Sequence, residues 1–231
     1  MMRDAAWKTA MMVRRAAGSV RRRGLWATVR LAAEAAGRLI WLRRHVLRFH
    51  IVNERAHRLT RPLEGIEWQE ATEADLEELL TCSRHFGPAE FRARRRAGHR
   101  CLIARAEDSR IVFYGWIGRG RAHVPVLGRT VAIPPDTAYY YNTFTEEAFR
   151  DRRLLPAFIS LAHEFTRREG IPYGFTLVDT EAGLPVRAYM RLVGAESIRL
   201  ITYRRLLGWR SWSERPIEPE QAGRLTRRKY R

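Results

Sequence analysis

The sequence predicts an α/β fold of the α+β type, in which a mixed β-sheet carries helices on its faces. Segments that alternate between apolar and polar residues predict strands, and two segments with apolar residues at three- and four-residue spacing predict amphipathic helices. Their order is strand–helix, a run of strands, and then strand–helix–strand–helix–strand, which is typical of a mixed sheet. Hydrophobic residues make up 45% of the 231 residues, enough for one domain with a packed core.

The predicted elements of the domain follow one another from residue 66 to residue 206. Thr72 and Asp75 form a capping-box-like pair at the start of the first helix, and the basic stretch after Pro88 is interpreted as a surface segment. Gly170 and Gly194 stand where two later helices are expected to end. The strands are expected at 66–72, 101–106, 110–118, 123–127, 129–133, 137–144, 173–178 and 197–206, and the helices at 73–86, 147–168 and 184–194.

The two ends of the chain carry most of its positive charge. Of the 43 lysines and arginines, 12 lie in residues 1–50 against two acidic residues, and nine lie in residues 204–231 against three. Basic ends suit anionic surfaces such as acidic lipids or nucleic acid. Only Lys8 and Lys229 are lysines, however, and a coding bias towards arginine explains this composition without such a partner. Nucleic-acid binding ranks last among the functions, because no base-reading motif is present.

We divide the chain into a basic helical extension with a linker (1–64), a central domain (65–207) and a basic tail (208–231). A helix is expected from residue 23 to about residue 51, because apolar residues recur at helical spacing. Its role stays open between packing on the domain, contact between two copies in a homodimer, and peripheral contact of residues 1–50 with a membrane.

We expect a cytoplasmic protein, with the inner face of the membrane as the alternative location. No segment approaches the roughly 20 consecutive apolar residues of a membrane span. The two cysteines, Cys82 and Cys101, lack the spacing of metal ligands and are too few for a disulfide framework. A reduced protein without a metal site is therefore expected.

The segment "EAFRDRRLLPAF" (147–158) places three arginines at the predicted start of a helix. The first N–H groups of a helix lack intrahelical partners, and the helix dipole adds partial positive charge there. Arginines at this end do not favour the helix itself, so Arg150, Arg152 and Arg153 indicate an anion site. The alternative is that they are solvated, with Asp151 and Glu147 as partners.

The order of elements and this segment resemble the GNAT superfamily of acyl-CoA-dependent N-acetyltransferases. In that family a central strand leads into an Arg/Gln-x-x-Gly-x-Gly/Ala loop that binds the pyrophosphate of the cofactor. Arg150 matches the first position, whereas Arg153 and Leu155 replace the two glycines. A second segment, "GLPVRAYMRLVGA" (183–195), is similar to a family motif in which a tyrosine protonates the leaving thiolate. Met190 stands at that position, and Tyr189 is one residue away.

The resemblance implies a splayed sheet and acetyl-CoA or another acyl-CoA as co-substrate. Pantetheine would pair with the strand that ends at Phe144 and Thr145. The pyrophosphate would bind at Arg150, Asp151, Arg152, Arg153, Leu154 and Leu155. The acceptor would be a primary amine of a small molecule or a sugar.

The chemistry needs an acid for the thiolate and an acceptor for the amine proton. Tyr189 is the first candidate for the acid, with Tyr140 and Tyr141 as alternatives. Glu146 is the first candidate for the proton acceptor, with Glu147 and His123 as alternatives. A GNAT-like domain without catalysis, which binds a partner or an anionic surface, is the alternative function, because the loop glycines are missing.

Overall fold

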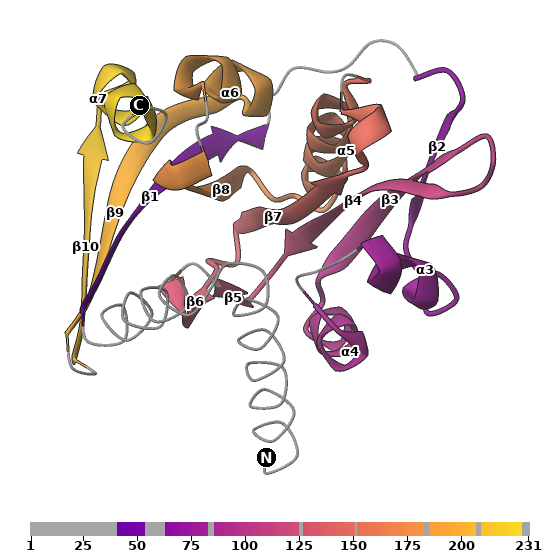
Figure 1. Ribbon diagram of the computed structural model, residues 1–231, viewed down its shortest axis with the longest axis horizontal. Coiled ribbons are helices and arrows are strands. Elements are labelled where there is room, and N and C mark those ends of the chain that lie inside the picture. The colour runs from indigo at the N-terminus through magenta and orange to yellow at the C-terminus, as the bar shows by residue number, and fades with distance from the viewer. Residues whose placement is uncertain are drawn as a thin grey trace, which may run out of the picture. The chain divides into compact units, whose positions relative to one another are not determined.

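The computed structural model describes residues 41–53, 63–82, 86–124, 127–150, 152–182, 185–206 and 209–227 (Figure 1). The first part of the expected N-terminal helix, the linker around Arg61 and Pro62, and Asp151 lie outside these residues. No described helix is long and apolar enough to span a membrane.

An eight-stranded mixed sheet forms the centre of the fold, as the sequence predicted. Its strands lie in the order β10-β9-β1-β8-β7-β4-β3-β2. Strands β7 and β8 are parallel, whereas β1 pairs antiparallel with β8, and the strands from β7 to β2 pair antiparallel. The bounds are β1 Trp41–Val52, β2 Ile66–Glu70, β3 Arg100–Ala106, β4 Ile111–Gly118, β7 Thr137–Thr145, β8 Tyr173–Asp179, β9 Ala195–Leu206 and β10 Trp209–Ile217.

Helices cover both faces of this sheet, and a small hairpin lies beside it. Helices α5, α6 and α7 lie on one face, and α3 and α4 lie on the other (Figure 1). The bounds are α3 Leu76–Cys82, α4 Pro88–Arg96, α5 Leu154–Arg168, α6 Val186–Val193 and α7 Pro219–Arg227, and the hairpin strands are β5 Arg121–Val124 and β6 Arg129–Ala132. The predicted glycine ends are confirmed, since Gly170 and Gly194 have φ angles of 70° and 66°.

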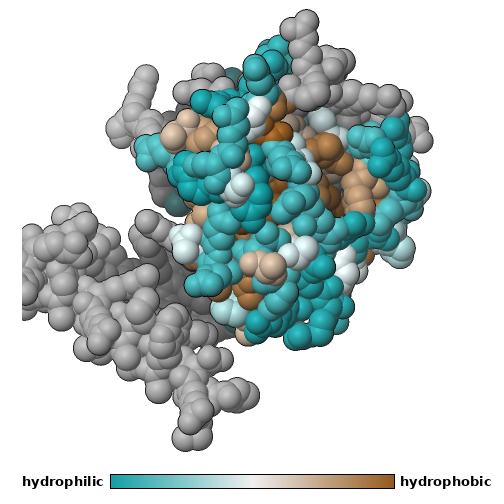
Figure 2. Space-filling view, turned by 90° about the vertical axis from the view of Figure 1, so that its right-hand side faces the viewer, coloured by the Kyte–Doolittle hydropathy of each residue, from teal (hydrophilic) through white to brown (hydrophobic). Residues whose placement is uncertain are grey.

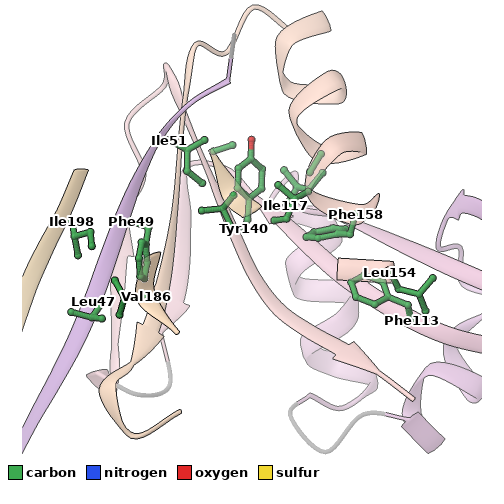
Figure 3. Close-up of a cluster of buried hydrophobic side chains, with 14 of the residues drawn as sticks. Leu47, Phe49, Ile51, Phe113, Ile117, Tyr140, Leu154, Phe158, Val186 and Ile198 are labelled. Carbon is green, nitrogen blue, oxygen red and sulfur yellow. The ribbon is translucent and has the colours of Figure 1, made fainter. Parts of the chain in front are cut away.

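The core lies between the sheet and the three helices on one of its faces, α5, α6 and α7. Figure 3 shows Phe49 of β1 beside Val186 of α6, and Phe113 of β4 beside Phe158 of α5. Tyr140 of β7 lies between these two groups, and the residue is 1% exposed. Burial of this many aliphatic and aromatic side chains supplies the main driving force for the fold.

The helix expected to reach residue 51 is wrong for residues 41–51, which form strand β1. Leu47, Phe49 and Ile51 alternate along β1 and are completely or almost completely buried. All three belong to the core cluster, so the period-two pattern of this segment decides its structure. The second half of β1 pairs with β8, from Val46–Asp179 to Val52–Tyr173.

Three further predictions change in detail. The stretch after Pro88 is a helix, α4, and its Arg94 is buried instead of lying on the surface. The helix of the arginine segment begins at Leu154, after a 3₁₀ turn at Glu147–Phe149, and not at residue 147. Residues assigned to the basic tail form strand β10 and helix α7. The division of the chain at residues 64 and 207 stays a prediction. The sheet includes β1 from before residue 64 and β10 from after residue 207.

The chain divides into two compact units. The larger comprises residues 44–202 and 213–231, and the smaller comprises residues 1–43 and 203–212. Figure 2 shows the side of the molecule that carries the β2 edge of the sheet. Its surface is mainly hydrophilic, and hydrophobic side chains show mostly within a hollow.

Candidate active site

Strands β7 and β8 separate halfway along their length and form a fork in the sheet. Their parallel pairing runs from Thr137–Tyr173 to Tyr140–Thr176 and ends there, although β7 continues to Thr145 and β8 to Asp179. Beyond this point each strand stays paired with its other neighbour, β7 with β4 and β8 with β1. The sheet is therefore splayed, and the edge of β7 facing β8 leaves backbone groups available from residue 141 onwards.

A β-bulge lies where the fork opens. Trp116 pairs with Tyr141 and Tyr114 pairs with Phe144, so Asn142 and Thr143 lie opposite a single residue of β4. Asn142 has a φ angle of 49°, a left-handed conformation that asparagine tolerates better than most residues. Its side-chain Nδ2 is buried and finds no acceptor among the described residues. An unpaired buried donor is costly, so it marks a place where a ligand acceptor fits.

The loop after β7 begins at Glu146, the first candidate for the proton acceptor. The Glu146 amide donates to the carbonyl of Val112 (2.9 Å), which fixes the start of the loop on β4. Nη1 of Arg110 donates to the Glu146 carboxylate (2.7 Å). The structure therefore places Glu146 at the end of the forked strand, with its carboxylate paired to an exposed guanidinium.

Arg153 sits immediately before α5 with a φ angle of 58° and a ψ angle of 26°, in the left-handed region. Glycine adopts this conformation freely, whereas a residue with a Cβ is strained in it. This is the position of the first family glycine in the resemblance noted above. The backbone thus keeps a glycine-like conformation although the residue is arginine.

At the start of α5, the first backbone N–H groups have no side-chain cap, and none of the described residues in the first turn is acidic. Leu154 is buried in the core and Leu155 packs against it, so these two residues offer only their backbone amides. Unpaired amides at a helix N-terminus attract anions.

The arginines of the loop reach into solvent. Arg150 is 64% exposed and lies 3.8 Å from the Glu147 carboxylate, a weak surface ion pair. The Arg152 guanidinium stacks over the Phe149 ring at 4.9 Å. Of the two partners expected for solvated arginines, Glu147 forms only this weak ion pair with Arg150.

Tyr189, the first candidate for the acid, lies near the base of the fork. Its hydroxyl forms a hydrogen bond with the side chain of Thr176, the last β8 residue paired with β7. Its ring packs edge-on against Phe49, with centroids 5.0 Å apart. Burial raises the pKa of the Tyr189 hydroxyl, so this group holds its proton at neutral pH.

The alternative acids are engaged in other contacts. The Tyr140 hydroxyl donates to Oδ1 of Asn53 (3.1 Å) and lies 3.0 Å from the Thr166 hydroxyl. The Tyr141 hydroxyl lies 2.6 Å from Nδ1 of His99. All three tyrosine hydroxyls therefore have a partner, and Tyr189 stays the first candidate because of its place in the sequence motif. The alternative proton acceptors are both exposed, His123 on the β5–β6 hairpin and Glu147 in the loop.

Sequence reasoning missed a buried arginine on the opposite face of β4 and β7. The Arg94 guanidinium lies about 5 Å from the rings of Phe86, Trp116 and Tyr141, at 5.1, 4.9 and 5.1 Å. Its Nη2 donates to Glu90 (2.7 Å), while its Nη1 has no acceptor among the described residues. The three-residue spacing of Phe91 and Arg94, both buried, is a signal that could have revealed this.

Two elements of the fork itself were also missed. Strand β1 supports β8, and its alternation of Leu47, Phe49 and Ile51 was a usable signal. The bulge at Asn142 had none beyond the residue type, because pairing with β4 decides where a bulge forms. No group of three or more His, Cys, Asp or Glu in the described ranges could hold a metal ion.

Comparison with known proteins identifies the fold. No protein-family model matches the sequence, and no curated protein matches it. A GCN5-related N-acetyltransferase from Sphaerobacter thermophilus is similar in structure, with a TM-score of 0.50 and 15% identity over 80% of this chain. A conserved protein of unknown function from Staphylococcus epidermidis gives a TM-score of 0.48 and 11% identity over 80% of this chain.

The chain spans 58% of the Sphaerobacter protein and 64% of the Staphylococcus protein, less than two thirds of either. An acetyltransferase assigned to the GNAT family from Novosphingobium aromaticivorans matches 71% of this chain and 65% of its own length, with 14% identity and a TM-score of 0.49. Similarity at this level of identity concerns the fold. The fork, the left-handed loop and the similarity to the Sphaerobacter enzyme agree with the resemblance seen in the sequence: this chain has the fold of the GCN5-related N-acetyltransferases.

Proposed function

We propose that the protein is an acyl-CoA-dependent N-acyltransferase, in the first place an N-acetyltransferase. The acceptor would be a primary amine of a small molecule or a sugar. The observation that carries the proposal is the fork, where β7 and β8 separate after Tyr140 and Thr176 beside the start of α5. A strand edge with unpaired backbone groups suits an extended ligand with amide groups, such as pantetheine.

The residues around the fork fit an acyl-CoA. The forked part of β7, with Phe144 and Thr145, would hold pantetheine through backbone hydrogen bonds. The pyrophosphate would bind the amides that begin α5 and the guanidinium groups of Arg150, Arg152 and Arg153. Asp151 belongs to the proposed loop by sequence alone. The left-handed conformation at Arg153 supports this fit, because it turns the loop as a glycine would.

Acyl-CoA would supply an acyl group activated as a thioester. In the proposal, the unpaired Nδ2 of Asn142 donates a hydrogen bond to a carbonyl oxygen of the substrate at the mouth of the fork. The Tyr189 hydroxyl holds the proton that the leaving thiolate takes up, and Glu146 accepts the proton of the amine.

Binding of acetyl-CoA, measured by isothermal titration calorimetry, tests the first half of the proposal. We expect Arg150→Ala and Arg153→Ala each to weaken binding about tenfold, because each removes a charge-assisted contact to phosphate. Arg96→Ala is the matched control, since Arg96 is an exposed arginine in the last turn of α4, which is not one of the elements of the proposed site. Absence of binding at millimolar acetyl-CoA would contradict the proposal.

Release of free CoA in the presence of a panel of small amines and amino sugars tests the second half. Amine-dependent release that falls in Tyr189→Phe would support acyl transfer. Binding of acetyl-CoA without release for any amine would instead favour the non-catalytic binding domain. The two measurements thus separate a cofactor site from an active enzyme.

A further inference from the structure

The hairpin formed by β9 and β10 has exposed apolar side chains at the end of β9 and the start of β10. We call the described residues Arg204, Leu206, Trp209 and Arg210 the hairpin tip. Trp209 is 69% exposed and Leu206 is 42% exposed. Among the described residues the only other large hydrophobic side chain with comparable exposure is Tyr173, at 38%, on β8. A monomeric protein gains nothing in stability from an exposed tryptophan, so an apolar pair at a hairpin tip indicates a surface for a partner.

The charge of the tip is entirely positive. Residues 203–212 contain three arginines and no acidic residue. The side chains of Arg204 and Arg210 are exposed, and no ion pair joins either of them to a described residue. Arginines in the body of the same sheet behave differently, because Arg48 and Arg199 both pair with Glu214, at 3.4 and 2.8 Å.

This combination matches one kind of surface best, an anionic lipid bilayer. Tryptophan is enriched at the boundary between headgroups and acyl chains, where its ring is apolar on one side and its N–H stays hydrated. Arginine extends its charge towards lipid phosphates while its aliphatic part stays in the apolar region. Each arginine near an anionic surface strengthens binding about fivefold.

We propose that the hairpin tip binds anionic phospholipid membranes, with Leu206 and Trp209 inserted at the headgroup level and Arg204 and Arg210 in contact with lipid phosphates. The contact is peripheral, because it uses two strand ends and not a spanning helix. This contact is separate from the membrane contact that the sequence analysis considered for residues 1–50. It does not depend on the proposed enzymatic function.

Nucleic acid and a second copy of the chain are the competing occupants. Nucleic acid would use the arginines, but it gives no role to Leu206 and only a stacking role to Trp209. A second copy would have to bring the two positively charged tips together or offer an acidic patch. The bilayer is the occupant that uses both the apolar pair and the arginines.

Co-sedimentation of the full chain with vesicles tests the proposal. We expect binding to vesicles of phosphatidylcholine with 30% phosphatidylglycerol and at least tenfold weaker binding to pure phosphatidylcholine vesicles. The double variant Leu206→Ala/Trp209→Ala should lower the affinity for anionic vesicles at least tenfold. Tyr173→Ala is the matched apolar control and should leave it unchanged.

The arginines are tested in the same way. Arg204→Gln/Arg210→Gln should weaken binding to anionic vesicles about 25-fold, since each charge contributes about fivefold. The double control Arg96→Gln/Arg121→Gln removes two exposed arginines elsewhere and should change the affinity less than threefold. Equal losses in the two double variants would overturn the proposal, because net charge alone would then explain the binding.

Quenching of tryptophan fluorescence by brominated lipids locates the inserted residue. We expect bromine near the headgroups to quench the wild-type protein and to quench Trp209→Phe much less, although Trp209→Phe still binds vesicles. Unchanged quenching in Trp209→Phe would overturn the insertion of the tip. Tip variants that lose dimers in size-exclusion chromatography, or lose binding to a DNA duplex, while vesicle binding stays intact would overturn it as well.

Discussion

Tyr140 and Asn142, two residues apart on β7, differ in whether their side-chain polar groups have hydrogen-bond partners. Tyr140 lies where β7 and β8 are still paired, and its hydroxyl contacts both Asn53 and Thr166. Asn142 lies where the strands have separated, and its Nδ2 has no acceptor among the described residues. Both side-chain polar groups are buried, so the contrast does not come from exposure to water.

The contrast separates a structural half of the strand from the half that we propose to bind a ligand. Buried polar groups in native proteins are nearly always paired, and pairing them fixes one arrangement of the surrounding elements. The network around Tyr140 joins β7, α5 and the residue that follows β1. The unpaired amide at Asn142 gives up that stability, as is common where a ligand completes the structure. Three substitutions test this division, at Asn53, His163 and Asn142.

Asn53→Ala should have the largest effect on stability. Nδ2 of Asn53 lies within hydrogen-bond distance of Thr166, Ile171 and Tyr173 (3.1, 2.8 and 3.2 Å), and its Oδ1 accepts from Tyr140. Removing the side chain leaves several buried groups unpaired, so we expect the free energy of unfolding to fall by about 4 kcal/mol. Urea denaturation measures it. A loss below about 1 kcal/mol would show that the network does not hold the paired half together.

His163 should make stability depend on pH. This residue of α5 is buried next to Tyr140, its ring nitrogens have no partner among the described residues, and burial lowers its pKa to about 4. The folded state therefore binds this proton less readily than the unfolded chain, and stability is lost as pH falls from 6.5 towards 4. The contribution of His163 to this loss should reach about 3 kcal/mol at pH 4.

The difference between the wild type and His163→Leu isolates that contribution from other titrating groups. At pH 7 the variant should be at least as stable as the wild type, because leucine needs no hydrogen-bond partner in an apolar site. Denaturation at pH 7, 6, 5 and 4 should show the wild type losing stability relative to the variant. A constant difference across this range would contradict a buried neutral His163.

Asn142→Gly should act on catalysis and leave stability nearly unchanged. Glycine accepts the φ angle of 49° at this position and removes the unpaired amide, so the free energy of unfolding should change by less than about 1 kcal/mol. If Nδ2 donates to the substrate, kcat should fall about 30-fold, which corresponds to about 2 kcal/mol. A variant with full activity would remove Asn142 from the proposed site. The expected pattern is the reverse of that for Asn53→Ala.

The sequence predicted most strands of the domain, because their patterns are local. The hairpin around Glu107 to Ser109 and the strand through Tyr140 form as expected. Strand β1 was taken for a helix because the alanine-rich pattern before it was extended too far. Its partner is β8, more than 120 residues away, and a local pattern carries no information on such pairing.

The candidate site was less predictable than the fold. The splay followed from the family resemblance and is confirmed by the end of pairing at Tyr140 and Thr176. Arg94 was placed on the surface because its stretch of the sequence is basic, whereas the rings of Phe86, Trp116 and Tyr141 enclose its guanidinium. A run of charged residues in a sequence does not indicate which of them is buried, because burial depends on tertiary packing.

The smallest expected effect concerns Arg153, where the contribution of the backbone conformation can be measured separately from that of the charge. Arg153→Gly and Arg153→Ala both remove the guanidinium, but only glycine adopts the left-handed conformation without strain. The glycine variant should therefore be more stable than the alanine variant by about 1 kcal/mol. Thermal or urea denaturation of the pair measures this difference.

Arg150 supplies the matched control, since its φ of −61° and ψ of −34° are right-handed. There the order should invert, with Arg150→Ala more stable than Arg150→Gly, because glycine loses more chain entropy on folding. An inverted order at Arg150 together with a glycine preference at Arg153 would locate the strain at one residue. It would also show that the loop keeps a glycine-shaped turn in which the arginine is strained. The same order at both positions would instead mean that the loop rearranges around any small residue, and the fit to a pyrophosphate would lose its backbone argument.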